Sequence, residues 1–178
     1  MLLVLVIAMV QARYFLSIGI LSAAKNFEQR QLLRETWLQE VRNNSELRAI
    51  FIVGRDANEA INEACQAEQA AKGDLLLTET PEDYYQIAAK TRRAIQWAFP
   101  GSDHLLKCDD DTVVHVEQLV EDLNQFLLYM GAFYWHAAAI REPWNKFYLS
   151  LKQWKRATLP NFAAGCGYIL GSALGNYL

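Results

Sequence analysis

The sequence predicts an α/β protein in which helices flank a mostly parallel β-sheet. Short apolar runs alternate with segments of helical periodicity, which is the pattern of consecutive strand–helix–strand units. The 178 residues are 52% hydrophobic and 21% charged, a composition that is typical of a folded domain and excludes a disordered chain. The formal net charge of −3 leaves no basic excess to neutralise phosphates, so we expect no nucleic-acid partner.

Residues 1–13 form an apolar N-terminal segment ahead of this pattern. Residues 1–10 are all apolar, but a span of the bilayer needs about 20 such residues. A signal peptide would begin with positive charge, which is absent here. Three interpretations therefore stay open: a clipped signal anchor, a signal-like segment, or an ordinary buried segment.

The predicted elements follow in order over residues 14–178. Apolar runs typical of buried strands occupy residues 14–21, 49–54, 75–78 and 104–108. Helical patterns occupy residues 26–41, 57–71, 84–98 and 116–127. We expect Asn26 to cap the first helix and Gly73 to follow the end of the second. Three aromatic residues on apolar helix stripes are expected in the core: Trp37, Tyr84 and Trp97.

Three adjacent carboxylates, Asp109, Asp110 and Asp111, directly follow the strand expected at residues 104–108. They repel one another unless a cation or solvent screens them. In an extended segment Asp109 and Asp111 would project to the same side and could hold a hard divalent ion, while Asp110 points away. The alternative is a solvated acidic turn that caps the next helix.

Two enzyme classes use an Asp-x-Asp pattern at the end of a strand. Nucleotide-sugar glycosyltransferases hold Mn²⁺ or Mg²⁺ there, against the diphosphate of the donor. Phosphatases of the haloacid dehalogenase type use the first Asp as a nucleophile. That nucleophile normally belongs to the first strand of its domain, whereas several predicted strands precede Asp109. The phosphatase interpretation is therefore the remote alternative.

Five short motifs occur one after another along nearly the whole chain. They are Arg-Gln-Leu-Leu-Arg-Glu-Thr-Trp at residues 30–37, Phe-Ile-Val-Gly at 51–54, Gly-Asp-Leu-Leu at 73–76 with Asp-Tyr-Tyr at 83–85 and Lys-Thr at 90–91, Lys-Cys-Asp-Asp-Asp at 107–111, and Pro160 with Gly-Cys-Gly-Tyr-Ile-Leu at 165–170. On these motifs the chain resembles the β1,3-glycosyltransferases of family 31. This Golgi group includes the β1,3-galactosyltransferases and relatives that transfer N-acetylhexosamines.

The resemblance implies a GT-A-like (Rossmann-like) domain at residues 14–178 that uses a UDP-sugar and Mn²⁺, with Mg²⁺ as a substitute. It implies inverting transfer of galactose or an N-acetylhexosamine to a glycan hydroxyl, in protein glycosylation. The full-length form would be a type II protein of the Golgi membrane with a lumenal domain. An acidic Glu-Asp-Val-x-x-Gly segment supplies the expected catalytic base in the family, so we expect a truncated domain whose base lies beyond Leu178. The alternative is a non-catalytic homologue that binds donor or glycan, or pairs with another transferase.

The resemblance also assigns roles to residues. Asp109 and Asp111 would carry the metal. The residues expected at the nucleotide sugar are Arg30, Arg34, Asp83, Lys90, Asp109 and Asp110. Arg34 could fork onto two phosphate oxygens, with a structural ion pair as the alternative. Asp83 and Lys90, expected on one helical face, have the same alternative.

Aromatic residues after the acidic motif lie in a segment of poor periodicity, where exposed rings could stack on an acceptor sugar. They are Trp135, Trp144, Tyr148 and Trp154. The cysteines lack metal-site spacing and are expected to be buried thiols: Cys65, Cys108 and Cys166. Asn43 begins an Asn-Asn-Ser sequon, which is a glycosylation site if the chain enters the secretory pathway.

Overall fold

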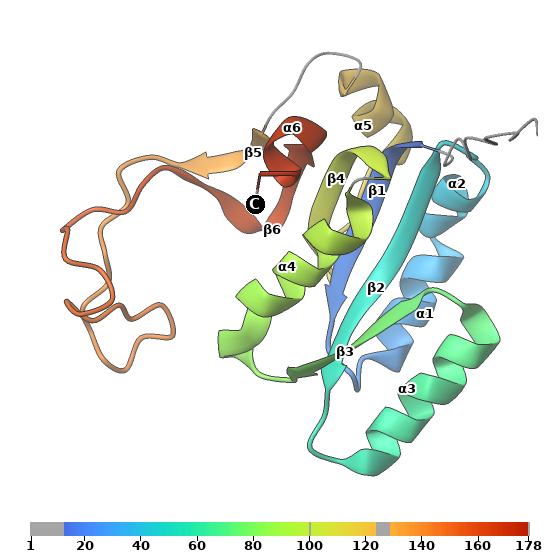
Figure 1. Cartoon of the computed structure of the whole chain (residues 1–178), viewed down its shortest axis with the longest axis horizontal. Coiled ribbons are helices and arrows are strands. Elements are labelled where there is room, and N and C mark those ends of the chain that lie inside the picture. Colours follow the sequence, from blue (N-terminus) through green and yellow to red (C-terminus); the bar gives the residue numbers. More distant parts are fainter. Residues whose placement is uncertain (1–12, 100, 124–128, 178) are drawn as a thin grey trace, which may run out of the picture.

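A computed structural model describes residues 13–99, 101–123 and 129–177 (Figure 1). One six-stranded sheet has the order β3-β2-β1-β4-β6-β5. Its strands are β1 (Tyr14–Ser22), β2 (Leu47–Arg55), β3 (Leu75–Pro81), β4 (Ser102–Asp109), β5 (Tyr129–Tyr134) and β6 (Phe162–Gly171). The strands β3, β2, β1 and β4 run parallel, and β6 is antiparallel to both β4 and β5. The predicted α/β class with a mostly parallel sheet is confirmed, and it is consistent with a GT-A-like fold.

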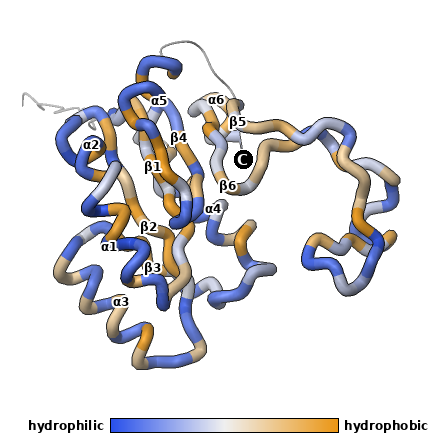
Figure 2. Tube along the Cα trace, turned by 180° about the vertical axis from the view of Figure 1, so that it is seen from behind, coloured by the Kyte–Doolittle hydropathy of each residue, from blue (hydrophilic) through white to orange (hydrophobic). Residues whose placement is uncertain are grey.

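Helices cover both faces of this sheet (Figures 1 and 2). They are α1 (Phe27–Glu35), α2 (Leu38–Arg42), α3 (Glu59–Lys72), α4 (Ile87–Ala98), α5 (Val116–Asp122) and α6 (Ser172–Gly175), with a 3₁₀ turn η1 (Tyr84–Gln86) before α4. No helix within the described ranges has the length and apolar character to cross a membrane. The apolar segment at residues 1–10 and the predicted helical residues 124–127 lie outside the described residues.

The central strand β1 separates two apolar cores. Leu16, Ile18 and Ile20 alternate along β1, are fully buried, and pack in the core that contains the buried residues of α1, α2 and α5. The opposite face of β1 turns toward α4, where Leu21 packs with the buried alanines of that helix. A strand buried on both faces reads as a continuous apolar run, which is why residues 14–21 were recognisable in the sequence.

The helix predicted over residues 26–41 is interrupted. α1 ends at Glu35, and Thr36 leaves the helical region with φ −113° and ψ −122° before α2 begins at Leu38. The Thr36 hydroxyl donates to the carbonyl of Leu32 at 2.8 Å, a local bond that bends helices. Leu33, Trp37 and Val41 are nevertheless all buried. The apolar periodicity was therefore correct although the continuous helix was wrong.

Three other expectations need correction or addition. α4 begins at Ile87 because residues 84–86 form a 3₁₀ turn, and Tyr84 is 47% exposed rather than part of the core. Trp97 is only partly buried against the core beneath α4. Strand β5 was not predicted, because its apolar residues follow almost directly on the pattern assigned to a helix at residues 116–127 and none of them is fully buried. The predicted end of α3 is confirmed, since Gly73 adopts a left-handed φ of 72°.

Candidate functional site

The acidic triplet lies at the carboxyl end of β4, between β1 and β6 in the sheet. The backbone N–H of Thr112 donates to the carbonyl of Asp109 at 3.2 Å, so the chain turns immediately after the strand. The expected extended geometry of Asp109–Asp110–Asp111 is therefore wrong. We call residues 109–112 the acidic turn. In parallel sheets, ligands bind at this edge.

Asp109 is paired with Lys107, two residues before it on the same strand. The Lys107 Nζ lies 2.6 Å from Asp109 Oδ1 and also donates to the carbonyl of Gly165 in β6. Lys107 is 2% exposed, whereas the Asp109 side chain is 41% exposed. The pairing follows from strand geometry, because residues i and i+2 project from the same face. Sequence reasoning did not assign this role to Lys107.

Asp110 is tied to the end of β1. Its Oδ2 accepts hydrogen bonds from Ser22 Oγ at 2.7 Å and from Asn26 Nδ2 at 2.9 Å. The register pairs Leu21 with Asp109, which places the next residues of the two strands side by side. Asn26 occupies the predicted N-cap position of α1, but its side chain makes no capping bond and binds Asp110 instead. Asp111 is exposed, with no hydrogen-bond donor among the described residues.

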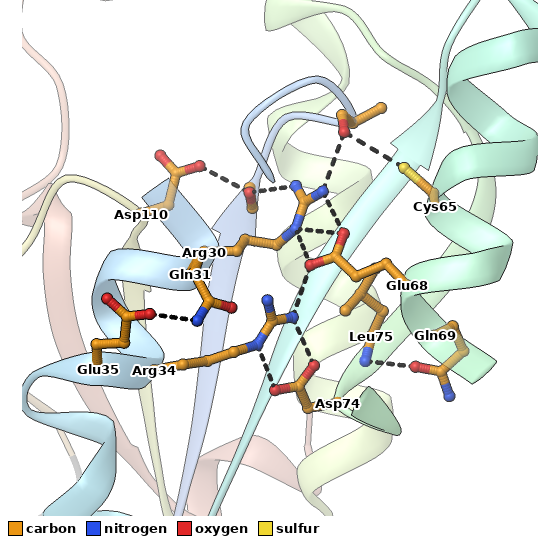
Figure 3. A network of polar contacts seen from close by, with 12 residues as sticks. Arg30, Gln31, Arg34, Glu35, Cys65, Glu68, Gln69, Asp74, Leu75 and Asp110 are labelled. Atoms are coloured by element: carbon orange, nitrogen blue, oxygen red, sulfur yellow. Dashed lines mark hydrogen bonds and ion pairs between the residues drawn. The ribbon is translucent and has the colours of Figure 1, made fainter. Parts of the chain in front are cut away.

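Arg30 is buried beside the acidic turn, with 0% exposure (Figure 3). Its Nε and Nη2 donate to the Glu68 carboxylate at 2.6–3.1 Å, and Nη2 also donates to the carbonyl of Ala24. Its Nη1 donates to Ser22 Oγ and to the carbonyl of Ala23. Every N–H of this guanidinium thus has an acceptor within the chain. Arg30, which the resemblance places at the nucleotide sugar, forms an internal ion pair with Glu68 in this structure.

Arg34 continues the same network and is 4% exposed. It forks onto the two carboxylate oxygens of Asp74 at 2.7 and 2.8 Å and donates to Glu68 at 2.7 Å (Figure 3). Burial alone would lower the pKa of Arg34, but the bonds to Asp74 and Glu68 outweigh it and raise that pKa. In this structure the Arg34 guanidinium binds the carboxylate of Asp74 through two hydrogen bonds, as in the alternative of a structural ion pair.

Lys90 and Asp83 do not share a helical face, contrary to expectation. Lys90 is 4% exposed, and its Nζ donates to the carbonyl of Ser22 and to Glu82 Oε1, both at 2.8 Å. Asp83 precedes the helix, is exposed, and accepts from the backbone N–H of Tyr85 at 3.0 Å. Lys90 therefore supports the end of β1 from within the protein, while the outer oxygens of Asp83 face solvent.

Glu82 is a partner that the sequence did not reveal. Besides Lys90, it accepts from the backbone N–H groups of Gly54 at 3.0 Å and Ala24 at 3.2 Å. A Cβ at position 54 would come within 2.9 Å of the Glu82 carboxylate and 2.8 Å of the Thr80 carbonyl, which explains the glycine there. The carboxyl ends of β1, β2 and β3 are joined through this one side chain.

The four candidate acceptor aromatics lie between β5 and β6. Residues 135–161 extend away from the sheet (Figure 1), and we call them the aromatic arm. Trp144 is 85% and Trp135 66% exposed, and Tyr148 is also exposed. Trp154 is half-buried and donates from Nε1 to the carbonyl of Thr158 at 2.9 Å. Trp135, Trp144 and Tyr148 are thus accessible, whereas Trp154 is bound to the backbone of the arm.

The thiols differ in exposure. Cys65 and Cys108 are buried as expected, but Cys166 is exposed, which corrects the expectation for that residue. Burial raises the pKa of Cys108 to about 12. Asn43 is exposed at the end of α2, so its amide is accessible to a glycosylating enzyme.

The donor chemistry of the acidic turn fits a hard divalent cation. Asp109 and Asp111 offer accessible carboxylate oxygens, the ligand type that Mg²⁺ and Mn²⁺ prefer. Within the described ranges no group of three or more His, Cys, Asp or Glu residues could hold a metal. Such cations commonly bind through one or two carboxylates together with substrate phosphates, so this turn suits a metal that arrives with a diphosphate. An open groove of about 320 Å³ adjoins it, lined in part by Cys108, Thr112 and Tyr168.

Comparison with known proteins identifies relatives over most of the chain. Residues 28–178 match a family model described as galactosyltransferase. The chain is 27% identical over 170 residues to hydroxyproline O-galactosyltransferase GALT2 of Arabidopsis thaliana, covering 92% of this chain and 25% of that protein. It is 25% identical over 163 residues to human beta-1,3-galactosyltransferase 5, covering 87% and 53%. With rat beta-1,3-galactosyltransferase 4 it shares 25% identity over 193 residues, covering 88% and 52%. The chain thus spans a quarter to about half of these relatives.

Proposed function

Because the chain belongs to the galactosyltransferase family, we propose that it acts in the transfer of a hexose from a UDP-sugar to a hydroxyl of a glycan or glycoprotein. The proposed donors are UDP-galactose or a UDP-N-acetylhexosamine, the proposed linkage is β1,3, and the anomeric centre is inverted. The observation that carries this proposal is the acidic turn at the carboxyl end of β4, with two accessible carboxylates.

Asp109 and Asp111 would hold Mn²⁺, or Mg²⁺, at this turn. A divalent metal supplies a Lewis acid that neutralises the negative charge on the departing UDP. Lys107 lies against Asp109 and offsets part of the negative charge of the triplet while the diphosphate is absent. Asp110 is held by Ser22 and Asn26, which keeps the turn against the end of β1.

The proposed donor contacts differ from those that the resemblance alone implied. Asp83 is exposed and could accept from a hydroxyl of the nucleotide ribose. Arg30, Arg34 and Lys90 are buried and are bound to carboxylates and carbonyls of this chain, so we propose that they support the site from within. An inverting transfer needs a base that takes the acceptor proton, and we assign none of the described residues to this role.

The aromatic arm is the proposed acceptor surface. Trp135, Trp144 and Tyr148 present exposed rings, and the flat apolar faces of sugars stack on such rings. We further propose a lumenal Golgi location, a membrane anchor in the full-length form and pairing with other transferases. The exposed sequon at Asn43 is compatible with passage through the secretory pathway.

The test is transfer of radiolabelled sugar from UDP-galactose and UDP-N-acetylhexosamines to a panel of glycan acceptors, with Mn²⁺ and with a chelator. In a form of the protein that also contains the catalytic base, the proposal predicts chelator-sensitive transfer that Asp111→Asn abolishes and that Glu63→Gln, at an exposed carboxylate on α3, leaves unchanged. UDP binding without any transfer by that form would instead favour the non-catalytic homologue. Phosphate-ester hydrolysis that is lost in Asp109→Asn would favour the phosphatase alternative.

A further inference from the structure

We infer that Ser22 is a positioning residue for the acidic turn, because its hydroxyl connects the buried Arg30 guanidinium to Asp110. Ser22 itself touches neither metal nor donor in this inference. It fixes the segment that carries Asp109 and Asp111. The inference rests on the proposed function, since it concerns the affinity of that turn for a divalent metal and a diphosphate.

Ser22 is enclosed on every side by fixed groups and is 1% exposed. Arg30 Nη1 lies 3.0 Å and Asp110 Oδ2 2.7 Å from its Oγ, and Lys90 donates to its backbone carbonyl at 2.8 Å. Arg30 is held in turn by Glu68 (Figure 3). The hydroxyl is therefore a link between the ion-pair network of α1 and α3 and the end of β4.

The chemistry of the three groups fixes the direction of the two hydrogen bonds. A guanidinium can only donate, so the Ser22 oxygen must accept from Arg30. A hydroxyl has a single hydrogen, which then points to Asp110, because the carbonyl of Ala23 is a poorer acceptor at 3.4 Å. An ionised carboxylate cannot donate, so Asp110 receives this hydrogen bond. Arg30 thus polarises the hydroxyl toward Asp110 without contacting the carboxylate.

Asp110 receives a second hydrogen bond on the same oxygen, from Asn26 Nδ2 at 2.9 Å. One donor is the last residue of β1 and the other lies in the segment that joins β1 to α1, and both hold the middle of the acidic turn. Asp109 and Asp111 flank this fixed residue on either side. Removal of a group that hydrogen-bonds a metal ligand typically lowers metal affinity about 10- to 100-fold, and Ser22 acts one residue further out, through Asp110, so we expect the lower end of this range.

The chain offers a matched control for this link, five residues earlier on the same strand. Ser17 is also buried in β1 and also accepts from an arginine, since Arg48 Nε lies 2.7 Å from its Oγ. Its second partner is Ser102 Oγ at 2.5 Å, at the start of β4, whereas the acidic turn lies at the other end of that strand. Ser22→Ala and Ser17→Ala therefore remove equivalent buried hydroxyls, and only one of them serves Asp110.

The experiment measures Mn²⁺ affinity by electron paramagnetic resonance and Mn²⁺-dependent UDP affinity by calorimetry, in the full chain. We expect Ser22→Ala to weaken both affinities about 10-fold, and Ser17→Ala to leave them within about twofold of the wild type. Ser22→Thr keeps the hydroxyl and should restore most of the affinity. Urea unfolding of the two alanine variants should show comparable losses, which separates positioning from general destabilisation.

Equal affinities in Ser22→Ala and Ser17→Ala would overturn the inference while the proposed function stands. If Ser22→Ala does not fold, Asn26→Ala tests whether the hydrogen bonds that hold Asp110 matter for the acidic turn, because Asn26 donates to the same carboxylate oxygen and is only half-buried. Unchanged Mn²⁺ and UDP affinities in Asn26→Ala would then overturn it. Absence of Mn²⁺-dependent UDP binding in the wild type would instead refute the proposed function, and the inference with it.

Discussion

Replacement of Glu68 by Gln tests whether the buried ion pairs hold α1 and α3 together. The Glu68 side chain is 10% exposed and accepts from Arg30, which is 0% exposed, and from Arg34. Gln keeps the shape of the side chain but removes the negative charge. Arg34 retains Asp74 as a partner, whereas Arg30 keeps no carboxylate partner among the described residues.

The expected loss follows from this burial. Breaking a buried ion pair by removing one partner costs about 3–5 kcal/mol, because the other charge stays desolvated. Gln still offers one carbonyl oxygen to Arg30, so we expect the lower end, about 3 kcal/mol. A domain of this size has a free energy of unfolding of about 5–15 kcal/mol, so the variant should fold with reduced stability.

Urea unfolding followed by tryptophan fluorescence gives the free energy of unfolding and its slope. The control is Glu59→Gln, the same substitution in the same helix, where Glu59 is 59% exposed in its pair with Arg55. An exposed pair contributes about 0–1 kcal/mol. Equal losses in the two variants, or a loss below about 1 kcal/mol in Glu68→Gln, would refute the assignment of Arg30 and Arg34 to a structural network.

Three further predictions concern pH, thiols and packing. Burial alone would raise the pKa of Glu68, but hydrogen bonds from Arg30 and Arg34 lower it below the ordinary 4.5. The ionised Glu68 therefore contributes its full stabilisation above about pH 4.5, and this contribution is lost as the pH falls through the lower pKa of the folded state. Urea unfolding at acid pH should accordingly show a free energy of unfolding that depends less on pH in Glu68→Gln than in the wild type. In the native protein at neutral pH a thiol reagent should modify Cys166 rapidly and reach Cys65 and Cys108 only on unfolding; rapid native reaction of Cys108 would contradict its burial. Gly19→Ala should cost about 1–3 kcal/mol in urea unfolding, because its Cβ would lie 2.8 Å from Ala94 Cβ, and Ala94→Gly in the double variant should recover part of this loss.

Much of the fold could be predicted from local sequence, because burial imposes a periodicity on each element. β1 reads as an unbroken apolar run since both of its faces are covered, and Gly73 marks the end of α3 because the chain there needs a left-handed residue. The break between α1 and α2 could not be predicted, because both pieces keep their apolar residues toward the sheet. β5 escaped prediction because it is held by backbone pairing to β6 and buries little.

The sequence predicted those parts of the candidate site that depend on neighbouring residues, and not the contacts between residues that are far apart in the chain. The acidic triplet could be placed at the end of a strand from its neighbours alone. The partners of Arg30 could not, because Glu68 lies 38 residues away and Ser22 comes from the preceding strand. Arg30 and Arg34, which suggested a phosphate contact, instead form ion pairs with Glu68 and Asp74, which the fold brings next to them. Glu82 had no sequence signal, since its importance comes from three elements that converge on it.

The most direct test of the account is calorimetry of UDP binding to the full chain with and without Mn²⁺. The proposed metal site at the acidic turn predicts binding that requires Mn²⁺, that is lost in Asp111→Asn, and that persists in Glu63→Gln. UDP binding that is independent of the metal, or equal in Asp111→Asn and the wild type, would contradict the proposed role of the acidic turn.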